Sequence, residues 1–253
     1  MKATLTGLGF VLCFAIAPFA SATTVNFTTG STNAGTMGNS LCYTAGGAAT
    51  SCNGSQFLMI TAWGITGGAG GDTTFAQGAL GHYAGTDLGL GVCNQDEGVN
   101  CNPPNHEVDN SGHDDFVLFQ FNTPVSNATV VLNPVCNCGY TDSTYYTGTG
   151  SAAISGLSLA QLSTVGFGSG TNRNGGNSQQ TFTLSGSGYT SILLGADVAG
   201  PHFGDDYFKI GSLTWTTGNE PPGTPEPSSV ISLGTGLGLL VCWARRKRGN
   251  SAC

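Results

Sequence analysis

The stretch Gln180-Thr181-Phe182-Thr183-Leu184 alternates polar and apolar side chains. Successive side chains of a β-strand point to opposite faces of a sheet, so this pattern predicts a strand with one buried face. Similar strand-like runs occur along the chain, separated by clusters of Gly, Asn, Asp and Ser. The clearest of them are residues 57–63, 116–121, 128–132, 189–194 and 207–215. The only helical candidate is short, near residues 158–163. This organisation predicts an all-β fold, an antiparallel two-sheet sandwich of jelly-roll type.

The composition also favours strands over helices. The chain has 253 residues, of which 41 are Gly, and charged residues make up only 8%. Ordinary soluble domains contain about 25% charged residues, and Lys, Arg and Glu are the usual formers of surface helices. Hydrophobic residues still account for 39%, enough to build a core. These values argue against a helical cytosolic enzyme and against a wholly disordered chain.

The charges are unevenly distributed. The formal net charge is −7, but four of the seven basic residues form one run near the C-terminus. Between Thr23 and Glu220 the only basic residues are Arg173 and Lys209, so that part of the chain carries about −11. A nucleic-acid-binding surface needs clustered Lys and Arg, and this composition excludes it.

The N-terminus has the features of a secretory signal peptide. Lys2 precedes an apolar run that ends on Ala20-Ser21-Ala22, with small residues at the two positions that signal peptidase reads. The run is shorter than the ~20 residues of a membrane-spanning helix. We therefore expect residues 1–22 to be a signal peptide, cleaved after Ala22.

The C-terminus combines three segments. Residues 219–229 form a Pro-rich linker that contains Pro225, Glu226 and Pro227. Residues 230–244 are uncharged, and a helix over 227–244 would be about 27 Å long, enough to span a bilayer. A basic tail, residues 245–253, follows at once with Arg245, Arg246, Lys247 and Arg248. Such a cluster orients a transmembrane helix with its C-terminus in the cytoplasm.

This order of segments, in a chain with a signal peptide, resembles the PEP-CTERM sorting tail of proteins processed by exosortases in Gram-negative bacteria. The resemblance covers about 25 residues and implies that a membrane-embedded exosortase recognises Pro225, Glu226 and Pro227. The enzyme would then remove the helix and release the body or transfer it to the cell envelope. A plain C-terminal membrane anchor is the alternative interpretation.

The cysteines of the exported part indicate disulfides. Six Cys lie between the two terminal segments, and an even number in an exported chain favours bridges. The spacing suggests two local pairs, Cys42 with Cys52 and Cys93 with Cys101, although six Cys permit fifteen connectivities. Cys136 and Cys138 are two residues apart and form either a labile bridge or bonds elsewhere. A zinc site is the alternative, but no second cysteine or histidine pair occurs at ligand spacing.

The middle of the chain is rich in polar residues. Gly89-Leu90-Gly91-Val92, Val108-Asp109-Asn110 and the strand-like run after Asp115 are similar to the body of one set of exosortase-dependent surface proteins. This second resemblance covers about residues 57–135. It implies a β-sandwich at the cell surface and does not imply any catalytic activity.

The same segment offers a candidate calcium site. Carboxylate and amide oxygens are the ligands that Ca²⁺ takes six to eight at a time. The candidate ligands are Glu107, Asp109, Asn110, Asp114 and Asp115. Asp and Asn are also ordinary turn residues, which is the alternative interpretation.

Enzymatic motifs are missing from the sequence. No G-x-S-x-G nucleophile elbow occurs, and His106-Glu107 is followed by Asn110 where a zinc protease needs its second His. A glycosidase pair among Glu97, Glu107, Asp109 and Asp114 stays open, because only their separation in space decides it. Tyr140, Tyr145 and Tyr146 are candidates for a sugar-stacking platform or for packing in strands.

We therefore predict five segments: signal peptide 1–22, exported domain 23–218, linker 219–229, transmembrane helix 230–244 and basic tail 245–253. The predicted function is that of a non-enzymatic protein of the cell surface or extracellular matrix. The resemblance implies signal peptidase, exosortase and the membrane as partners, and a structural or adhesive role with exopolysaccharide. The alternative is a carbohydrate-binding module or a glycoside hydrolase that acts on envelope polysaccharide. No cofactor is expected apart from structural Ca²⁺.

Overall fold

The computed structural model describes residues 22–29, 35–66, 73–83, 88–97, 107–135, 139–149, 153–199 and 204–217. All of them belong to the first of two compact units, Met1–Gly218 and Asn219–Cys253. The predicted signal peptide up to residue 21, the linker with its Pro-Glu-Pro motif, the transmembrane helix and the basic tail lie outside the described residues. A search of the described part of the chain for a helix long and apolar enough to cross a bilayer finds none.

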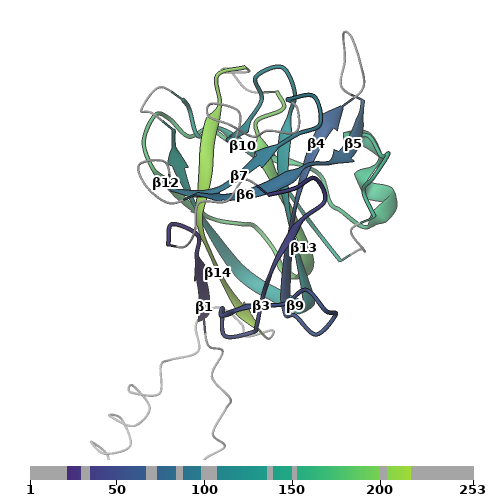
Figure 1. The fold of residues 1–253 in the computed structure, drawn as a ribbon, viewed down its shortest axis with the longest axis vertical. Helices are drawn as coiled ribbons and strands as arrows, with labels where there is room; N and C mark the ends of the chain where they lie inside the picture. Colours follow the sequence, from purple (N-terminus) through teal and green to yellow (C-terminus); the bar gives the residue numbers. More distant parts are fainter. Residues whose placement is uncertain are drawn as a thin grey trace, which may run out of the picture. The chain divides into compact units, whose positions relative to one another are not determined.

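The described part of the chain is an antiparallel β structure with one short helix, which confirms the all-β prediction (Figure 1). Each of the six strand-like runs in the sequence contributes to a strand, and the helical candidate near residue 158 is a 3₁₀-helix. In chain order the elements are β1 (Ala22–Asn26), β2 (Ser40–Tyr43), β3 (Ala49–Thr50), β4 (Leu58–Thr66), β5 (Thr74–Gln77), β6 (Ala79–Tyr83), β7 (Gly89–Cys93), β8 (Val108–Asp109), β9 (Asp115–Pro134), β10 (Ser143–Gly148), η1 (Leu159–Val165), β11 (Thr171–Arg173), β12 (Gln180–Thr183), β13 (Ser187–Ala196) and β14 (Tyr207–Thr217).

The 20-residue strand β9 belongs to two groups of strands. Its first part, residues 115–121, lies between β4 and β13, and these lead on to β2 and β5 on one side and to β10 and β11 on the other. Its second part, residues 129–132, lies between β12 and β14, and β14 also pairs with β1, β7 and β8. One strand thus connects the whole pairing network.

The sequence suggested two separate strands, 116–121 and 128–132, where the structure has one. The chain stays extended through Pro124, whose fixed φ is compatible with a strand. Asn127 has a φ of 51°, and the register against β13 shifts next to it. Such an irregularity bends a strand and increases its twist, which lets β9 pass from one group to the other.

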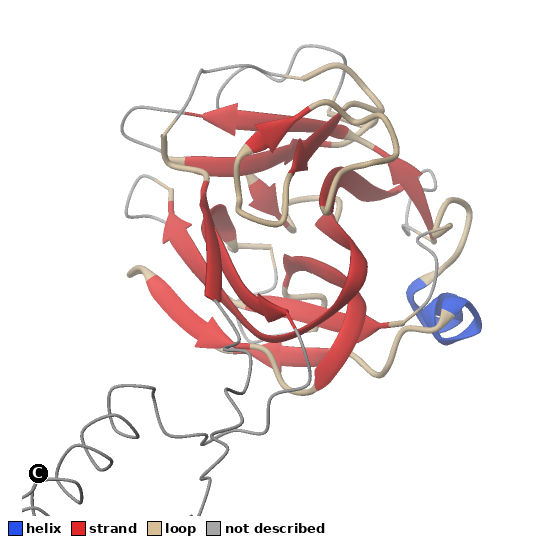
Figure 2. Ribbon diagram, turned by 90° about the horizontal axis from the view of Figure 1, so that it is seen from below, coloured by secondary structure: helices blue, strands red, loops and turns tan. Residues whose placement is uncertain are grey.

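The main hydrophobic core receives side chains from both groups of strands. Val117 and Phe119 come from the first part of β9, and Leu132 comes from its second part. Trp215 of β14 is fully buried, and its ring stacks on Phe57 with 5.9 Å between the ring centroids. Figure 2 shows strands around the interior of the domain.

A second core explains why the run Phe116-Val117-Leu118-Phe119 is apolar without alternation. Phe116 and Leu118 face away from the main core and pack with Trp63, Phe75 and Leu162. Leu162 belongs to η1, and this short helix lies beside the strands rather than among them (Figure 2). Both faces of the strand are therefore buried, which is typical of a continuous apolar run.

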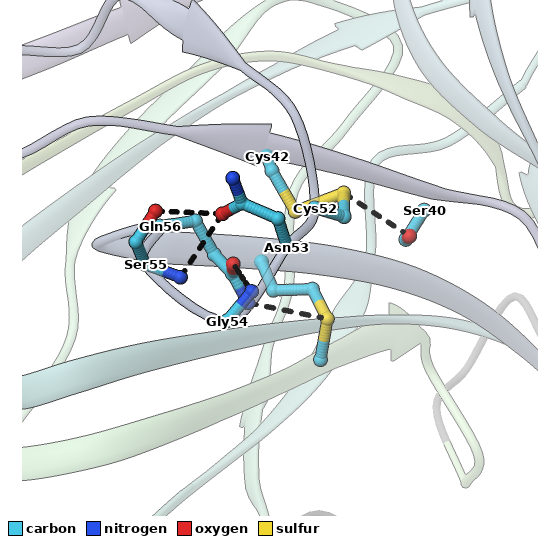
Figure 3. Close-up of a disulfide and its surroundings, with 8 residues drawn as sticks. Ser40, Cys42, Cys52, Asn53, Gly54, Ser55 and Gln56 are labelled. Atoms are coloured by element: carbon cyan, nitrogen blue, oxygen red, sulfur yellow. Dashed lines mark hydrogen bonds between the residues drawn. A yellow bond between two sulfur atoms is a disulfide. The ribbon is translucent and has the colours of Figure 1, made fainter.

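The predicted disulfide between Cys42 and Cys52 is present, with 5.3 Å between the two Cα atoms. It links β2 to the turn after β3, where Asn53 Oδ1 accepts the backbone N–H of Ser55 at 3.1 Å (Figure 3). Cys93 is also disulfide-bonded. The predicted pair Cys93–Cys101 and the fates of Cys136 and Cys138 lie outside the described residues and stay predictions.

Replacing Cys42 and Cys52 together by Ser should lower the free energy of unfolding by about 2–3 kcal/mol, because the bridge closes a loop of ten residues in the unfolded chain. The midpoint of thermal unfolding of the full-length protein should fall by roughly 4 to 12 °C. The exposed neighbour Ser51 offers a control, since Ser51→Ala should leave the midpoint unchanged. Equal midpoints for the double variant and the natural protein would contradict the expectation.

Candidate functional site

The candidate site is built around a turn at Asn94, immediately after β7. Asn94 Oδ1 accepts the backbone N–H groups of Asp96 at 2.9 Å and of Glu97 at 3.1 Å. The Glu97 carboxylate in return accepts the backbone N–H of Asn94 at 3.0 Å. An Asn side chain that folds back onto its own backbone in this way forms a tight turn. The turn fixes the position of the Glu97 carboxylate.

Gly64 allows this turn to lie against β4. A Cβ atom at residue 64 would be 2.4 Å from the Cβ of Asn94, so only Gly permits the approach. Gly64 pairs with Asp115 across the sheet, and Asn94 Nδ2 donates to Asp115 Oδ1 at 3.1 Å. The turn and the first residue of β9 are thus held together.

Asp109 reaches the same place from the short strand β8, which pairs with β14. Its Oδ1 accepts the backbone N–H of Ser111 at 2.8 Å. One carboxylate oxygen each from Glu97, Asp109 and Asp115 lies within 4.8 Å of the others. We call these three residues the carboxylate cluster. Their convergence from three separate segments could not be read from the sequence.

Burial raises the pKa values of the carboxylate cluster. Asp115 is fully buried and Asp109 is 5% exposed. Desolvation, opposed by the hydrogen bond from Ser111 and supported by the charges of Glu97 and Glu107, raises the pKa of Asp109 to about 7. Burial also raises the pKa of Asp115 well above its ordinary value, and Asp115 Oδ2 has no hydrogen-bond partner among the described residues.

One buried cation lies near the carboxylate cluster. Lys209 of β14 is fully buried, and its Nζ lies 4.4 Å from the centroid of the Tyr83 ring. Burial is the largest cause of the raised pKa values of Glu97 and Asp109, and the positive charge of Lys209 opposes part of that rise. Burial and the charges of Glu107 and Glu97 raise the pKa of Tyr83 to about 12. Negative groups still outnumber this lysine.

The structure brings together only some of the predicted calcium ligands. Asp109 and Asp115 belong to the carboxylate cluster, and Glu107 is buried close enough to raise the pKa of Asp109. Asn110 is directed elsewhere, and its Nδ2 donates to Asp206 Oδ2 at 2.7 Å. Asp114 precedes Asp115 in an extended segment, so its side chain points to the other face. Burial raises the pKa of Tyr146 on that face, and the charge of Asp114 adds to the rise.

Two further expectations can be compared with the structure. Sequence reasoning named Glu97 as a glycosidase candidate and not as a metal ligand. Its spacing of three residues from Asn94, which allows the hydrogen bond between them, is the sequence feature that could have indicated its place in the turn. Tyr145 is 2% exposed and Tyr146 is 8% exposed, so these rings pack in the two cores and do not form a sugar-stacking platform.

No protein-family model matches this chain, and comparison with curated proteins finds no match either. The role of the carboxylate cluster is therefore inferred from its own geometry and charge.

Without divalent cations, the stability of the protein should decrease as the pH rises from about 4 to about 7. The folded-state pKa of Asp109 lies above the ordinary Asp value, so the folded chain binds more protons than the unfolded chain in this range. Thermal unfolding of the full-length protein in a chelating buffer, followed by tryptophan fluorescence, measures the effect.

Asp109→Asn keeps the acceptor oxygen and stays neutral, so its midpoint should vary less with pH than that of the natural protein. The exposed residue Asp205 provides the control, because Asp205→Asn should follow the natural curve. Parallel curves for Asp109→Asn and the natural protein would show that Asp109 does not titrate in this range.

Proposed function

We propose that the chain is a non-enzymatic exported protein of the cell surface or extracellular matrix, sorted by an exosortase through its C-terminal tail. Its role would be structural or adhesive, in association with exopolysaccharide. The observation that carries the proposal is the Cys42–Cys52 disulfide, since disulfides persist in oxidising compartments outside the cytoplasm. It supports the export that the N-terminal segment predicts.

The finer architecture belongs to the same proposal. We infer that the two groups of strands joined by β9 are the two layers of a sandwich of jelly-roll type. The main core, to which both groups contribute, supports this arrangement. A strand that passes between layers at a bulge is a usual way to form the corner of such a fold.

The sorting step rests on the tail sequence. Exosortase would recognise Pro225, Glu226 and Pro227, with the helix 230–244 in the inner membrane and the basic tail 245–253 in the cytoplasm. Signal peptidase would have removed residues 1–22 beforehand. The mature protein would then consist of the β domain and what remains of the linker.

Changing Pro225, Glu226 and Pro227 together to Ala should leave the full-length form in the inner membrane. Fractionation and immunoblotting of cells that contain the exosortase measure this. Pro221 and Pro222 lie in the same linker, so their replacement by Ala is a matched control that should be processed normally. Processing of the triple variant at the natural rate would refute recognition of the motif.

The carboxylate cluster supports a structural role for Ca²⁺. Three carboxylates, with Glu107 nearby, supply the hard oxygen ligands that this ion prefers. An ion at this position would join the Asn94 turn, β8 and the start of β9. Ca²⁺ would also replace the protons that the raised pKa values indicate, because metal binding requires deprotonated ligands.

Burial of the carboxylate cluster supports a non-enzymatic protein. A glycosidase must admit a sugar ring between its two carboxyl groups. Asp109 is 5% exposed and Asp115 is fully buried, which suits a small ion better than a polysaccharide. The buried rings of Tyr145 and Tyr146 give the carbohydrate alternative no further support.

About 1 mM Ca²⁺, the range in which extracellular sites bind, should raise the midpoint of thermal unfolding of the full-length protein above its value in chelator. The rise should be roughly 5 to 10 °C at 100 times the dissociation constant. Asp115→Asn removes a ligand charge and should reduce the rise, whereas Asp205→Asn should not. A rise in the natural protein that Asp115→Asn leaves unchanged would argue against this site.

A further inference from the structure

Lys209 is a fully buried base beside the carboxylate cluster. In the ladder between β14 and β8, Tyr207 is directly opposite Asp109, so Lys209 is a diagonal neighbour of Asp109. Alternate residues of a strand share a face, and diagonal neighbours on one face are about 7–8 Å apart, within reach of a long side chain. Lys209 and Asp109 therefore face the same buried side of this strand pair.

The fold fixes the position of the Lys209 ammonium group. Its Nζ lies 4.4 Å from the centroid of the Tyr83 ring, and the face of an aromatic ring attracts a cation. Tyr83 pairs with Gly89 of β7. A Cβ atom at residue 89, whose φ is 136°, would be 2.5 Å from the carbonyl oxygen of Ile210 and 3.0 Å from Lys209 Cβ. Gly89 thus allows β7 to lie directly against β14 and to cover Lys209.

The charge of Lys209 acts on the carboxylate cluster. It opposes the rise that burial causes in the pKa values of Glu97 and Asp109. Burial, followed by the charges of Glu107 and Glu97, raises the pKa of Tyr83, whose ring is in contact with the same ammonium group. The base, the ring and the carboxylates are therefore close enough to interact electrostatically. Carboxylates at this range favour the charged form of an amine.

His113 is a second basic group near the carboxylate cluster. Its charge also opposes the rise in the pKa of Glu97, but its Nδ1 lies 3.6 Å from Asp96 Oδ2, outside the cluster. His113 is charged only when it is protonated. Lys209, which acts on both Glu97 and Asp109, is better placed to neutralise the cluster.

We propose that Lys209 is the built-in counter-ion of the carboxylate cluster and that its fixed charge limits the affinity of the cluster for Ca²⁺. This inference rests on the Ca²⁺ site proposed above and names the residue that sets the ion concentration at which the site fills. A buried cation beside buried carboxylates offsets their mutual repulsion and repels an incoming divalent ion. The domain therefore folds without Ca²⁺ and binds the ion only in the millimolar range of extracellular sites.

Lys209→Met removes the charge and should lower the dissociation constant for Ca²⁺ by roughly tenfold, since a unit charge several Å away changes the binding of a divalent ion by this factor even at the dielectric constant of water. Titration calorimetry of the full-length protein in a nonionic detergent at about pH 8, where fewer protons compete for the carboxylates, measures the constant. Lys209→Arg keeps the charge and should keep the natural affinity.

Arg173→Met is the matched control, because Arg173 is the other base between Thr23 and Glu220. Its guanidinium lies over the rings of Tyr145 and Phe182, 5.9 Å and 5.7 Å from their centroids. The loss of this charge should leave the dissociation constant for Ca²⁺ unchanged.

Two further measurements separate a charge effect from a structural one. Tb³⁺ is more highly charged than Ca²⁺, so Lys209→Met should increase its affinity by a larger factor, which tryptophan-sensitised Tb³⁺ luminescence measures. The midpoint of thermal unfolding in chelator should be lower for Lys209→Met than for the natural protein, because the buried carboxylates lose their counter-ion. A residue with a purely structural role would lower the midpoint and weaken the binding of both ions.

Lys209→Gln is a second neutral variant with a polar end group. Midpoints over a series of Ca²⁺ concentrations give the dissociation constant even for a variant that is unfolded in chelator, because an ion that binds only the folded chain raises the midpoint by mass action.

The outcomes distinguish the role of Lys209 from the Ca²⁺ site itself. Tighter binding by both neutral variants, but not by Arg173→Met, supports the role of Lys209. If the natural protein binds Ca²⁺ as tightly as the neutral variants or more tightly, or if Arg173→Met tightens binding equally, the role of Lys209 is overturned and the site remains. Binding by the neutral variants alone supports the role of Lys209 and overturns the site in the natural protein. No binding by any of these proteins overturns both.

Discussion

The 20-residue strand β9 pairs with β4 and β13 along its first part and with β12 and β14 along its second part. Its first part is covered on both faces, by the main core around Val117 and by the second core around Phe116. Its second part supplies Leu132 to the main core and pairs with β14. Because both groups of strands pair with the same backbone, neither can shift its register without moving the other. The bend at Asn127 is therefore as much a part of the fold as the apolar side chains.

The buried carboxylates lower the stability of the folded domain. Burying a carboxylate without a counter-ion disfavours folding by several kcal/mol, even after relaxation of the surroundings. Hydrogen bonds from Asn94 to Asp115 and from Thr144 to Asp197 offset part of this penalty. The positive charge of Lys209 offsets part of the penalty at Asp109. Buried carboxylates are tolerated when a bound group neutralises their charge. Protons and cations are the simplest groups that can do so.

The sequence predicts the strands well because alternation and apolar runs are local properties. The run at residues 180–184 became β12, and the cysteines ten residues apart became a bridge. The continuity of β9 through Pro124 depends on its partners in space, and local patterns do not contain that information.

The candidate ligands could be predicted only in part, for the same reason. Asp109 and Asp115 were found from their density in one segment, whereas Glu97 joins them only through a turn packed against Gly64. Asp114 and Asn110 looked equivalent to their neighbours and face elsewhere, because adjacent residues of an extended chain point in opposite directions.

The pairing of β1 with β14 determines how the domain is presented. Ala22 is opposite Thr216, so the chain enters and leaves the described domain at the same pole. Lys209 and Asp206 lie at the other end of β14, and ten residues of strand separate that end from Thr217 by roughly 30 Å. The carboxylate cluster therefore lies at the end of the described domain that is remote from both of its termini, because Asp109 pairs with Tyr207 at the start of β14. An ion bound there would join the Asn94 turn, β8 and the start of β9 without involving the strand ends through which the chain enters and leaves.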